Sequence, residues 1–248
     1  MSIKFTLICA AFIAFQGITA FAVKEDVEGI AKAAKRALED YKSITAAYID
    51  YATEKLGATL AENEEAATAV EEAGSVIIKN NVDASTKELE KLEQLAQDWN
   101  VDIYDCAADA RENLKSLIGT VNGDLKNCNS NIINQSTLIM DDAIEGFKDM
   151  ASEGTERYTE SVDGCISADP KDQYKCFNGV LNAIQNSIHT YPNYVIANVK
   201  QVQQQLKVVG KGLELCEIRA GTQSAQLSAK IIGVVTRCLS NKLPEPQM

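Results

Sequence analysis

"CISADPKDQYKC", from Cys165 to Cys176, is the stretch of sequence that decides how this chain folds. Asp169 and Pro170 favour a turn, and the segments on either side are rich in strong helix formers. The stretch therefore predicts the sharpest corner of the chain, where one helix ends and the next runs back in the opposite direction. The two cysteines flank this corner closely enough for a disulfide to close it.

The remaining cysteines of this region lie symmetrically about the corner. Cys128 and Cys216 are almost equally distant from it in sequence, and so are Cys106 and Cys238. In an antiparallel helical hairpin, residues at equal distances from the turn face each other. We therefore predict three nested disulfides: Cys165–Cys176, Cys128–Cys216 and Cys106–Cys238.

A local pairing of the cysteines is the alternative. Cys106 and Cys128 are 22 positions apart, as are Cys216 and Cys238. A straight helix of that length spans about 33 Å, whereas a disulfide needs its two Cα atoms within about 7 Å. Local pairing thus requires both segments to fold back. The sequence "GTVNGD" (residues 119–124) offers a turn in the first segment, but the second contains only isolated glycines. The spacing favours the nested pairs and leaves the local ones as the alternative.

Apolar residues recur with the 3-4 spacing of a helix face over residues 27–51, 89–110, 174–191 and 199–220. This pattern predicts an all-α protein, namely an elongated, disulfide-stapled antiparallel helical bundle or hairpin with heptad-like apolar stripes. We expect one helix to end in "KNNVDAST" (residues 79–86), a turn or kink at residues 121–124, and a kink or helix end at Pro192. Gly210 and Gly212 indicate a flexible or closely packed helix position.

The beginning of the chain has the features of a secretory signal peptide. Lys4 precedes an apolar stretch, residues 5–15, that is too short to span a bilayer, and Ala20 and Ala22 form a small-residue cleavage pattern. We expect cleavage after Ala22 and a secreted, extracellular protein. The expected segments are a signal peptide (1–22), an N-terminal helical segment (23–82), a disulfide-bonded helical domain (83–240) and a disordered tail (241–248).

The net charge of the chain limits the classes of partner that it is expected to bind. The chain has 24 basic and 35 acidic residues and a net charge of -11. A net negative charge of this size repels phosphates, so nucleic acid and anionic lipid are poor partners. No later apolar run is long enough for membrane insertion after the signal peptide is removed. Removal of the signal leaves six cysteines, an even number that suggests a disulfide framework.

The sequence contains few candidate catalytic, metal-binding or modification sites. The one histidine, His189, has no accompanying nucleophile motif, so we expect no catalytic site, no metal site and no cofactor. Asn134, in "NQS", is the one N-glycosylation sequon. Tyr41, Tyr48 and Tyr51 lie on one helix stripe, which is most simply a core stripe. The alternative is that these tyrosines, with Trp99, line a cavity for a small hydrophobic ligand.

Three segments resemble the TsetseEP domain, a secreted helical module of insects. "YDCAADARENL" (residues 104–114) resembles its Tyr-x-x-Cys-x-x-Ala segment, and "DPKDQYKCF" (169–177) is similar to its central Asp-Pro and cysteine segment. "LELCEIRAGTQSAQLSAKIIGVVTRCL" (213–239) is similar to its closing segment. The resemblance covers residues 95–240, while the Glu-Pro repeats of the founding member shrink here to one "PEP" (244–246).

The resemblance implies an extracellular protein of insect gut, haemolymph or gland secretion without an established enzyme activity. We therefore expect a non-enzymatic helical binding protein that recognises a protein, a glycan or a microbial surface. Defence is one role that such binding would serve. A carrier of a small hydrophobic ligand is the alternative function.

Overall fold

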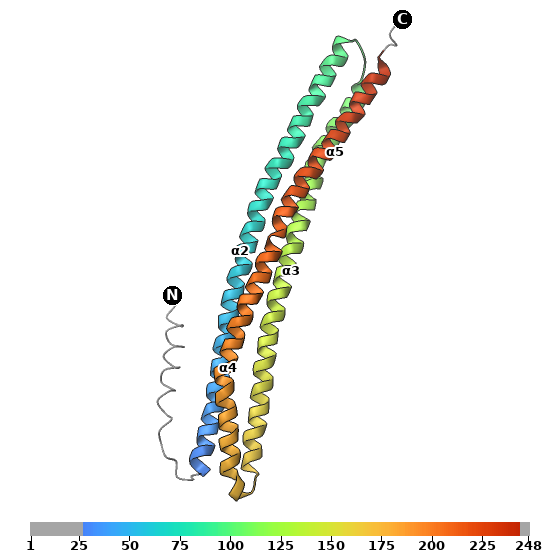
Figure 1. Ribbon diagram of the computed structural model, residues 1–248. Helices are drawn as coiled ribbons and strands as arrows, with labels where there is room; N and C mark the ends of the chain where they lie inside the picture. Colours follow the sequence, from blue (N-terminus) through green and yellow to red (C-terminus); the bar gives the residue numbers. More distant parts are fainter. Residues whose placement is uncertain (1–26, 244–248) are drawn as a thin grey trace. The chain divides into compact units, whose positions relative to one another are not determined.

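The computed structural model describes residues 27–243, and its helices are labelled in Figure 1. The helices are α2 (Val27–Asp98), α3 (Tyr104–Ile166), α4 (Pro170–Gly210) and α5 (Gly212–Lys242). These described residues contain no β-strand, so the predicted all-α class is confirmed. The predicted signal peptide (1–22) and most of the predicted tail (241–248) lie outside the described residues.

The helices pack as two compact units, each assembled from separate stretches of sequence. The described part of unit 1 comprises residues 27–47 and 150–192, and that of unit 2 comprises residues 48–149 and 193–243. Helices α2, α3 and α4 contribute residues to both units, whereas α5 belongs to unit 2. Each unit is a bundle of helical segments with its own buried core.

Unit 1 contains the corner predicted from "CISADPKDQYKC". Helix α3 ends at Ile166 and α4 begins at Pro170, after a turn of three residues. The backbone N–H groups of Asp172 and Gln173 both donate to the Asp169 carbonyl oxygen, which joins the turn to the first turn of α4. The core beyond the corner is apolar and aromatic. Its buried members are Ile30, Ala34, Ala37, Leu38, Tyr41, Tyr158, Val162, Cys165, Phe177, Ile184 and Ile188.

Unit 2 combines parts of α2, α3 and α4 with α5, and the cross-links between these helices show their directions. Asn63 and Asn81 of α2 donate to the carbonyl oxygens of Leu206 and Gly221, so α2 runs parallel to the end of α4 and to α5. Cys106 and Cys128 of α3 pair with later and earlier positions of α5, respectively, so α3 is antiparallel to α5. The apolar stripes face inward. Fully buried side chains include Ile78, Leu89, Leu114, Val121, Leu125, Leu206, Leu213 and Val235.

The predicted helix end in residues 79–86 is wrong, because α2 continues to Asp98. Ile78 and Val82 are buried in the core of unit 2, and the Asn81 amide donates to Gly221 O and Ser224 Oγ instead of competing for its own backbone. Tertiary contacts thus outweigh the turn propensity of this stretch. The predicted boundary between segments 23–82 and 83–240 therefore does not coincide with a helix end.

Two other positions where the sequence predicted a turn, a kink or a helix end lie within continuous helices. Helix α3 is unbroken through residues 121–124, where Val121 is fully buried and Asn122 Oδ1 accepts a hydrogen bond from Ser75 Oγ. Helix α4 continues through Pro192 to Gly210.

The chain does break at Lys211, between Gly210 and Gly212. A Cβ atom on Gly210 would lie 2.3 Å from Asn63 Oδ1, and one on Gly212 would lie 2.8 Å from Ile132 Cδ1. Of the two interpretations that the sequence allowed for these glycines, a flexible or a closely packed position, the structure shows close packing. The two glycines allow α2 and α3 to approach the junction of α4 and α5.

Candidate functional site

The disulfides are the most definite feature that the sequence predicted. The structure pairs Cys106 with Cys238, Cys128 with Cys216 and Cys165 with Cys176, at Cα–Cα distances of 6.7, 5.8 and 5.5 Å. These are the three nested pairs, so the local alternative is excluded. The first two lie in unit 2 and the third lies in unit 1.

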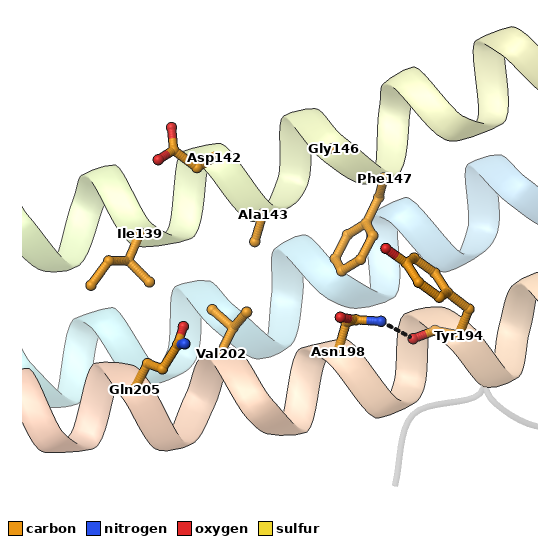
Figure 2. A pocket seen from close by; sticks show the side chains of 9 residues that line it. All are labelled: Ile139, Asp142, Ala143, Gly146, Phe147, Tyr194, Asn198, Val202 and Gln205. Carbon is orange, nitrogen blue, oxygen red and sulfur yellow. Dashed lines mark hydrogen bonds between the residues drawn. The ribbon is translucent and has the colours of Figure 1, made fainter.

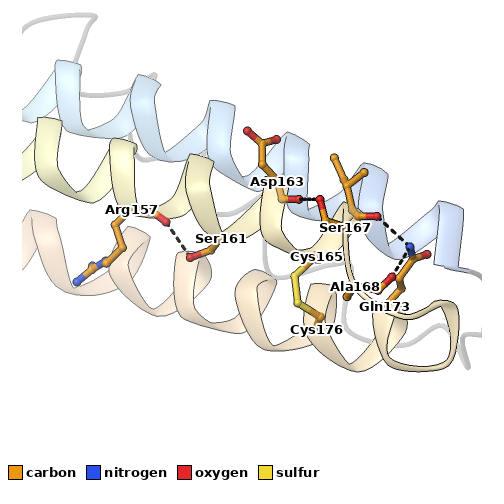
Figure 3. The surroundings of a disulfide bond; sticks show 9 residues. Arg157, Ser161, Asp163, Cys165, Ser167, Ala168, Gln173 and Cys176 are labelled. Carbon is orange, nitrogen blue, oxygen red and sulfur yellow. Dashed lines mark hydrogen bonds between the residues drawn. A yellow bond between two sulfur atoms is a disulfide. The ribbon is translucent and has the colours of Figure 1, made fainter.

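Figure 3 shows the surroundings of the Cys165–Cys176 disulfide. Cys165 is fully buried beside the corner, and Gln173 braces the turn by donating from Nε2 to the carbonyl oxygens of Ile166 and Ala168. The disulfide and these hydrogen bonds hold the end of α3 against the start of α4. Disulfides of this kind are typical of proteins in oxidising, extracellular surroundings.

Tyr41 belongs to the core of unit 1. Its exposed fraction is 3%, and its ring packs edge-to-face on Tyr158 and Tyr191 at centroid distances of 5.3 and 6.4 Å. Burial, with a further contribution from Tyr158, raises the pKa of the Tyr41 hydroxyl above its ordinary value of 10.0, and Arg157 opposes this shift. The core interpretation of the predicted stripe therefore applies to Tyr41.

Tyr48, Tyr51 and Trp99 do not form the predicted lining of one cavity. Tyr48 and Tyr51 pack on each other, with ring centroids 6.1 Å apart, at the start of unit 2. Trp99 follows the last residue of α2 and is 47% exposed. The helix between Tyr51 and Trp99 is about 70 Å long at 1.5 Å per residue, so the two side chains cannot share a ligand.

A groove in unit 2 is the better candidate for a ligand site. It lies between α3 and α4 and has a volume of about 400 Å³, within the range of small-molecule sites. Figure 2 shows Ala143 and Phe147 projecting from α3 toward α4, while Tyr194, Asn198 and Val202 project from α4. The remaining lining residues are Ile139, Asp142, Gly146 and Gln205.

The lining of the groove is largely apolar and aromatic. The Phe147 and Tyr194 rings meet edge-to-face at a centroid distance of 6.2 Å, and Asn198 Nδ2 donates to the Tyr194 carbonyl oxygen at 2.8 Å. Phe147 is buried, whereas Tyr194 is 44% exposed, so the aromatic pair runs from the core to the surface. Such an arrangement offers an apolar floor with a few polar groups at its edge.

The sequence analysis missed this aromatic pair, although its symmetry contained a usable signal. Phe147 and Tyr194 lie at nearly equal distances from the corner, as the paired cysteines do. Ala143 and Gly146, two small residues on α3, leave the space that the rings do not fill. No sequence pattern indicated that a groove lies between α3 and α4 at this position, because the groove depends on the side chains of both helices.

Asn134 lies on the exposed surface of α3, and its use as a glycosylation site stays a prediction. Ser136, the last residue of the sequon, is fully buried and accepts a hydrogen bond from Asn63 Nδ2. In the folded protein the sequon therefore has one member facing solvent and another facing the core.

Within residues 27–243, no group of three or more His, Cys, Asp and Glu side chains is placed to hold a metal ion. Helices α2 to α5 also include none that is long and apolar enough to cross a membrane. Comparison with protein-family models, with curated proteins and with solved structures finds no match.

Proposed function

We propose that the protein is a secreted, non-enzymatic binding protein of an insect secretion, similar to TsetseEP-domain proteins, that recognises a microbial or other extracellular surface. The observation that carries this proposal is the set of three disulfides within an all-α bundle. Staples of this kind suit a rigid protein that must persist outside the cell, where proteases act on transiently unfolded chains.

The surface of the bundle supports a role in binding. Large apolar side chains such as Tyr104, Leu138 and Leu215 expose 63–75% of their area. Exposed large apolar side chains are the groups that a binding partner can cover. The bundle presents them on helices that the disulfides hold in fixed register.

The test is expression of the full chain in insect cells, followed by recovery from the medium. We expect a mature chain that begins at Val23, contains the three mapped disulfides, and sediments with whole bacteria or fungi. A chain retained inside the cell with free thiols contradicts secretion. A correctly oxidised, secreted chain that binds no microbe contradicts the microbial partner while leaving secretion intact.

The carrier function remains the second candidate because the groove has a suitable size and lining. Native mass spectrometry of the secreted protein would reveal a co-purified hydrophobic molecule. The Gly146→Leu substitution should fill the groove and remove that molecule, since a Cβ at Gly146 meets no atom within 4 Å and the fold can accept it.

Gly119→Leu is the matched control for this substitution. Gly119 is also an exposed glycine of α3 with open space around its Cβ position, and it lies outside the groove. A bound molecule that both variants retain excludes the groove as the carrier site.

A further inference from the structure

Positive charge is concentrated in one stretch of this acidic chain. Residues 193–243 contain seven lysines and arginines but only two acidic residues, whereas the entire chain has 35 acidic against 24 basic residues. All seven basic side chains are exposed on the end of α4 and on α5. They are Lys200, Lys207, Lys211, Arg219, Lys230, Arg237 and Lys242.

The same stretch exposes three aliphatic side chains. Val208, Leu215 and Ile218 are 68%, 67% and 63% exposed. Leu215 and Ile218 are three residues apart on α5, the spacing that places side chains on one face of a helix. Val208 lies in the last turn of α4, and Lys211 between the two helices keeps right-handed helical backbone angles, so the spacing of seven residues to Leu215 keeps Val208 on the same side. The opposite face of α5 is buried in unit 2 through Leu213, Cys216 and Ala220.

Basic residues share the outward face with these aliphatic residues. Lys211 lies one turn from both Val208 and Leu215, and Arg219 lies one turn beyond Leu215. We name this outward face, with Lys207, the basic ridge: Lys207, Val208, Lys211, Leu215, Ile218 and Arg219. Glu214, which is exposed, and Glu217, which is half-buried, lie in the same stretch, so residues 207–219 hold three basic and two acidic side chains. All of its members belong to unit 2.

The lysines and the arginine of the basic ridge form no direct ion pair within the described part of the chain. The ion pairs there join Lys42 to Glu39, Lys55 to Glu54 and Arg111 to Glu93, and none includes a residue of the ridge. Aliphatic groups are therefore exposed to solvent near lysine and arginine side chains, across the junction of α4 with α5, and two disulfides bond α5 to α3.

We infer that the basic ridge docks on an anionic phospholipid surface, an inference that rests on the proposed function and specifies its partner. Val208, Leu215 and Ile218 would enter the headgroup layer, and the lysine and arginine side chains would reach lipid phosphates at the same depth. Acidic residues outnumber basic ones on α2 and α3, so such a surface would repel those helices, and this favours an approach through the basic stretch that contains the ridge.

Other anionic partners fit the ridge less well. A nucleic acid duplex would contact the basic groups but would leave the three aliphatic side chains in water, and the ridge has no aromatic residue on which a base could stack. An acidic helix of a second copy would satisfy the charges, and the experiment below distinguishes it.

The test is sedimentation of the mature protein with lipid vesicles. We expect binding to vesicles of equal parts phosphatidylglycerol and phosphatidylcholine, little binding to pure phosphatidylcholine, and loss of binding in high salt. The double variant Lys207→Glu with Lys211→Glu should bind at least about 25-fold more weakly, since each surface cation contributes a factor of about 5.

The matched charge control is Lys79→Glu with Lys91→Glu, two exposed lysines of α2. It changes the net charge equally but leaves the ridge intact, so its binding should be much closer to that of the natural protein. For the apolar part, Leu215→Ser with Ile218→Ser should weaken binding roughly tenfold or more, because water-to-lipid transfer of those groups is lost. Val76→Ser with Leu138→Ser, at other exposed aliphatic positions, is the control.

Equal binding to neutral and anionic vesicles, or equal effects of ridge and control variants, would overturn the inference. So would a dimer that the ridge variant dissociates in sedimentation velocity while the natural protein ignores vesicles, since the occupant would then be a second copy. Ridge variants that still sediment with whole microbes would refute the ridge as the contact but leave the proposed function standing.

Discussion

A close approach between a glycine and an aromatic ring lies within unit 1. Gly154 faces the Tyr41 ring so closely that a Cβ atom there would lie 2.1 Å from the Tyr41 hydroxyl oxygen and 2.9 Å from ring atom Cζ. Tyr41 is itself held between Tyr158 and Tyr191. The glycine therefore makes room for an aromatic ring that is confined on its other sides.

Gly154→Ala should destabilise the protein by about 1–3 kcal/mol, because the Tyr41 ring must move out of its packed position. Gly164→Ala is the control on the same helix, since a Cβ there meets nothing within 4 Å. It should leave stability unchanged or raise it by up to about 1 kcal/mol through better helix propensity. Urea denaturation of both variants measures the difference, and equal midpoints would contradict the tight contact.

The raised pKa of Tyr41 predicts a dependence of stability on pH. Because burial raises the pKa of Tyr41 in the folded state above the value of 10.0, the folded state holds this proton more tightly than the unfolded state. The contribution is complete below pH 10 or so and is lost as the pH rises through the higher folded-state pKa. We expect the free energy of unfolding to fall above about pH 10.

The variant Tyr41→Phe lacks this group, so its unfolding free energy should fall less steeply over the same alkaline range. Urea denaturation at a series of pH values gives both slopes. Identical slopes would show that Tyr41 does not contribute to the alkaline loss of stability.

Polar residues in the helix interfaces of unit 2 set the alignment of α2 with its neighbours. Asn63 Nδ2 donates to Ser136 Oγ of α3 and to the Leu206 carbonyl oxygen of α4. Asn129 donates to the Ala67 carbonyl oxygen, but its Oδ1 is the one buried side-chain polar atom in residues 27–243 without a hydrogen-bond partner. The two asparagines are therefore expected to differ in what they contribute.

Asn63→Leu should lower the free energy of unfolding by about 1–3 kcal/mol, because two hydrogen bonds between helices are lost from a buried site. Asn129→Leu should change it by less than about 1 kcal/mol, since the lost hydrogen bond is offset by removal of a buried acceptor without a partner. Thermal and urea unfolding compare the two variants. An Asn129→Leu variant as unstable as Asn63→Leu would contradict this assignment.

Disulfides restrict the unfolded chain as a whole, and their effect depends on the length of sequence that each one closes. Cys165–Cys176 has a sequence separation of 11, whereas Cys128–Cys216 has a separation of 88. The chain-entropy model assigns about 3 kcal/mol to the shorter loop and about 4–5 kcal/mol to the longer one.

Replacing Cys128 and Cys216 by serine should therefore destabilise the protein more than replacing Cys165 and Cys176. Denaturant unfolding of the two double-serine variants, without reducing agent, measures the order. The reverse order would show that strain or residual structure in the unfolded state outweighs loop closure at these sites.

Much of the architecture was predictable because it depends on the spacing of residues along the chain. Helical periodicity identifies the class, and the symmetry of the cysteines about residues 165–176 identifies the pairs. Isolated turn signals were less informative. Asn80 and Asn81 suggested a helix end, but a neighbouring helix supplies the hydrogen-bond acceptors that make an asparagine acceptable within α2.

The candidate sites were less predictable than the fold. The tyrosine stripe was visible in the sequence, yet Tyr41 fills a core and Trp99 lies far from Tyr51. The groove at Phe147 and Tyr194 depends on which side chains of two helices leave space between them. A sequence pattern indicates that a helix face is apolar, but it does not indicate whether the face is filled, hollow or uncovered.

The sequence by itself thus determined the all-α class and the corner near Pro170, and it favoured the three nested disulfides over local pairs, because spacing along a helix converts directly into position along a hairpin. Only the tertiary structure decided where charge and apolar surface come together. The net charge of -11 argued against anionic partners. Packing, however, buries Leu213 and Cys216 of α5 and leaves Leu215 and Ile218 exposed near basic residues. Surface potential and exposure are properties of which faces the neighbouring helices cover, and that is decided in three dimensions.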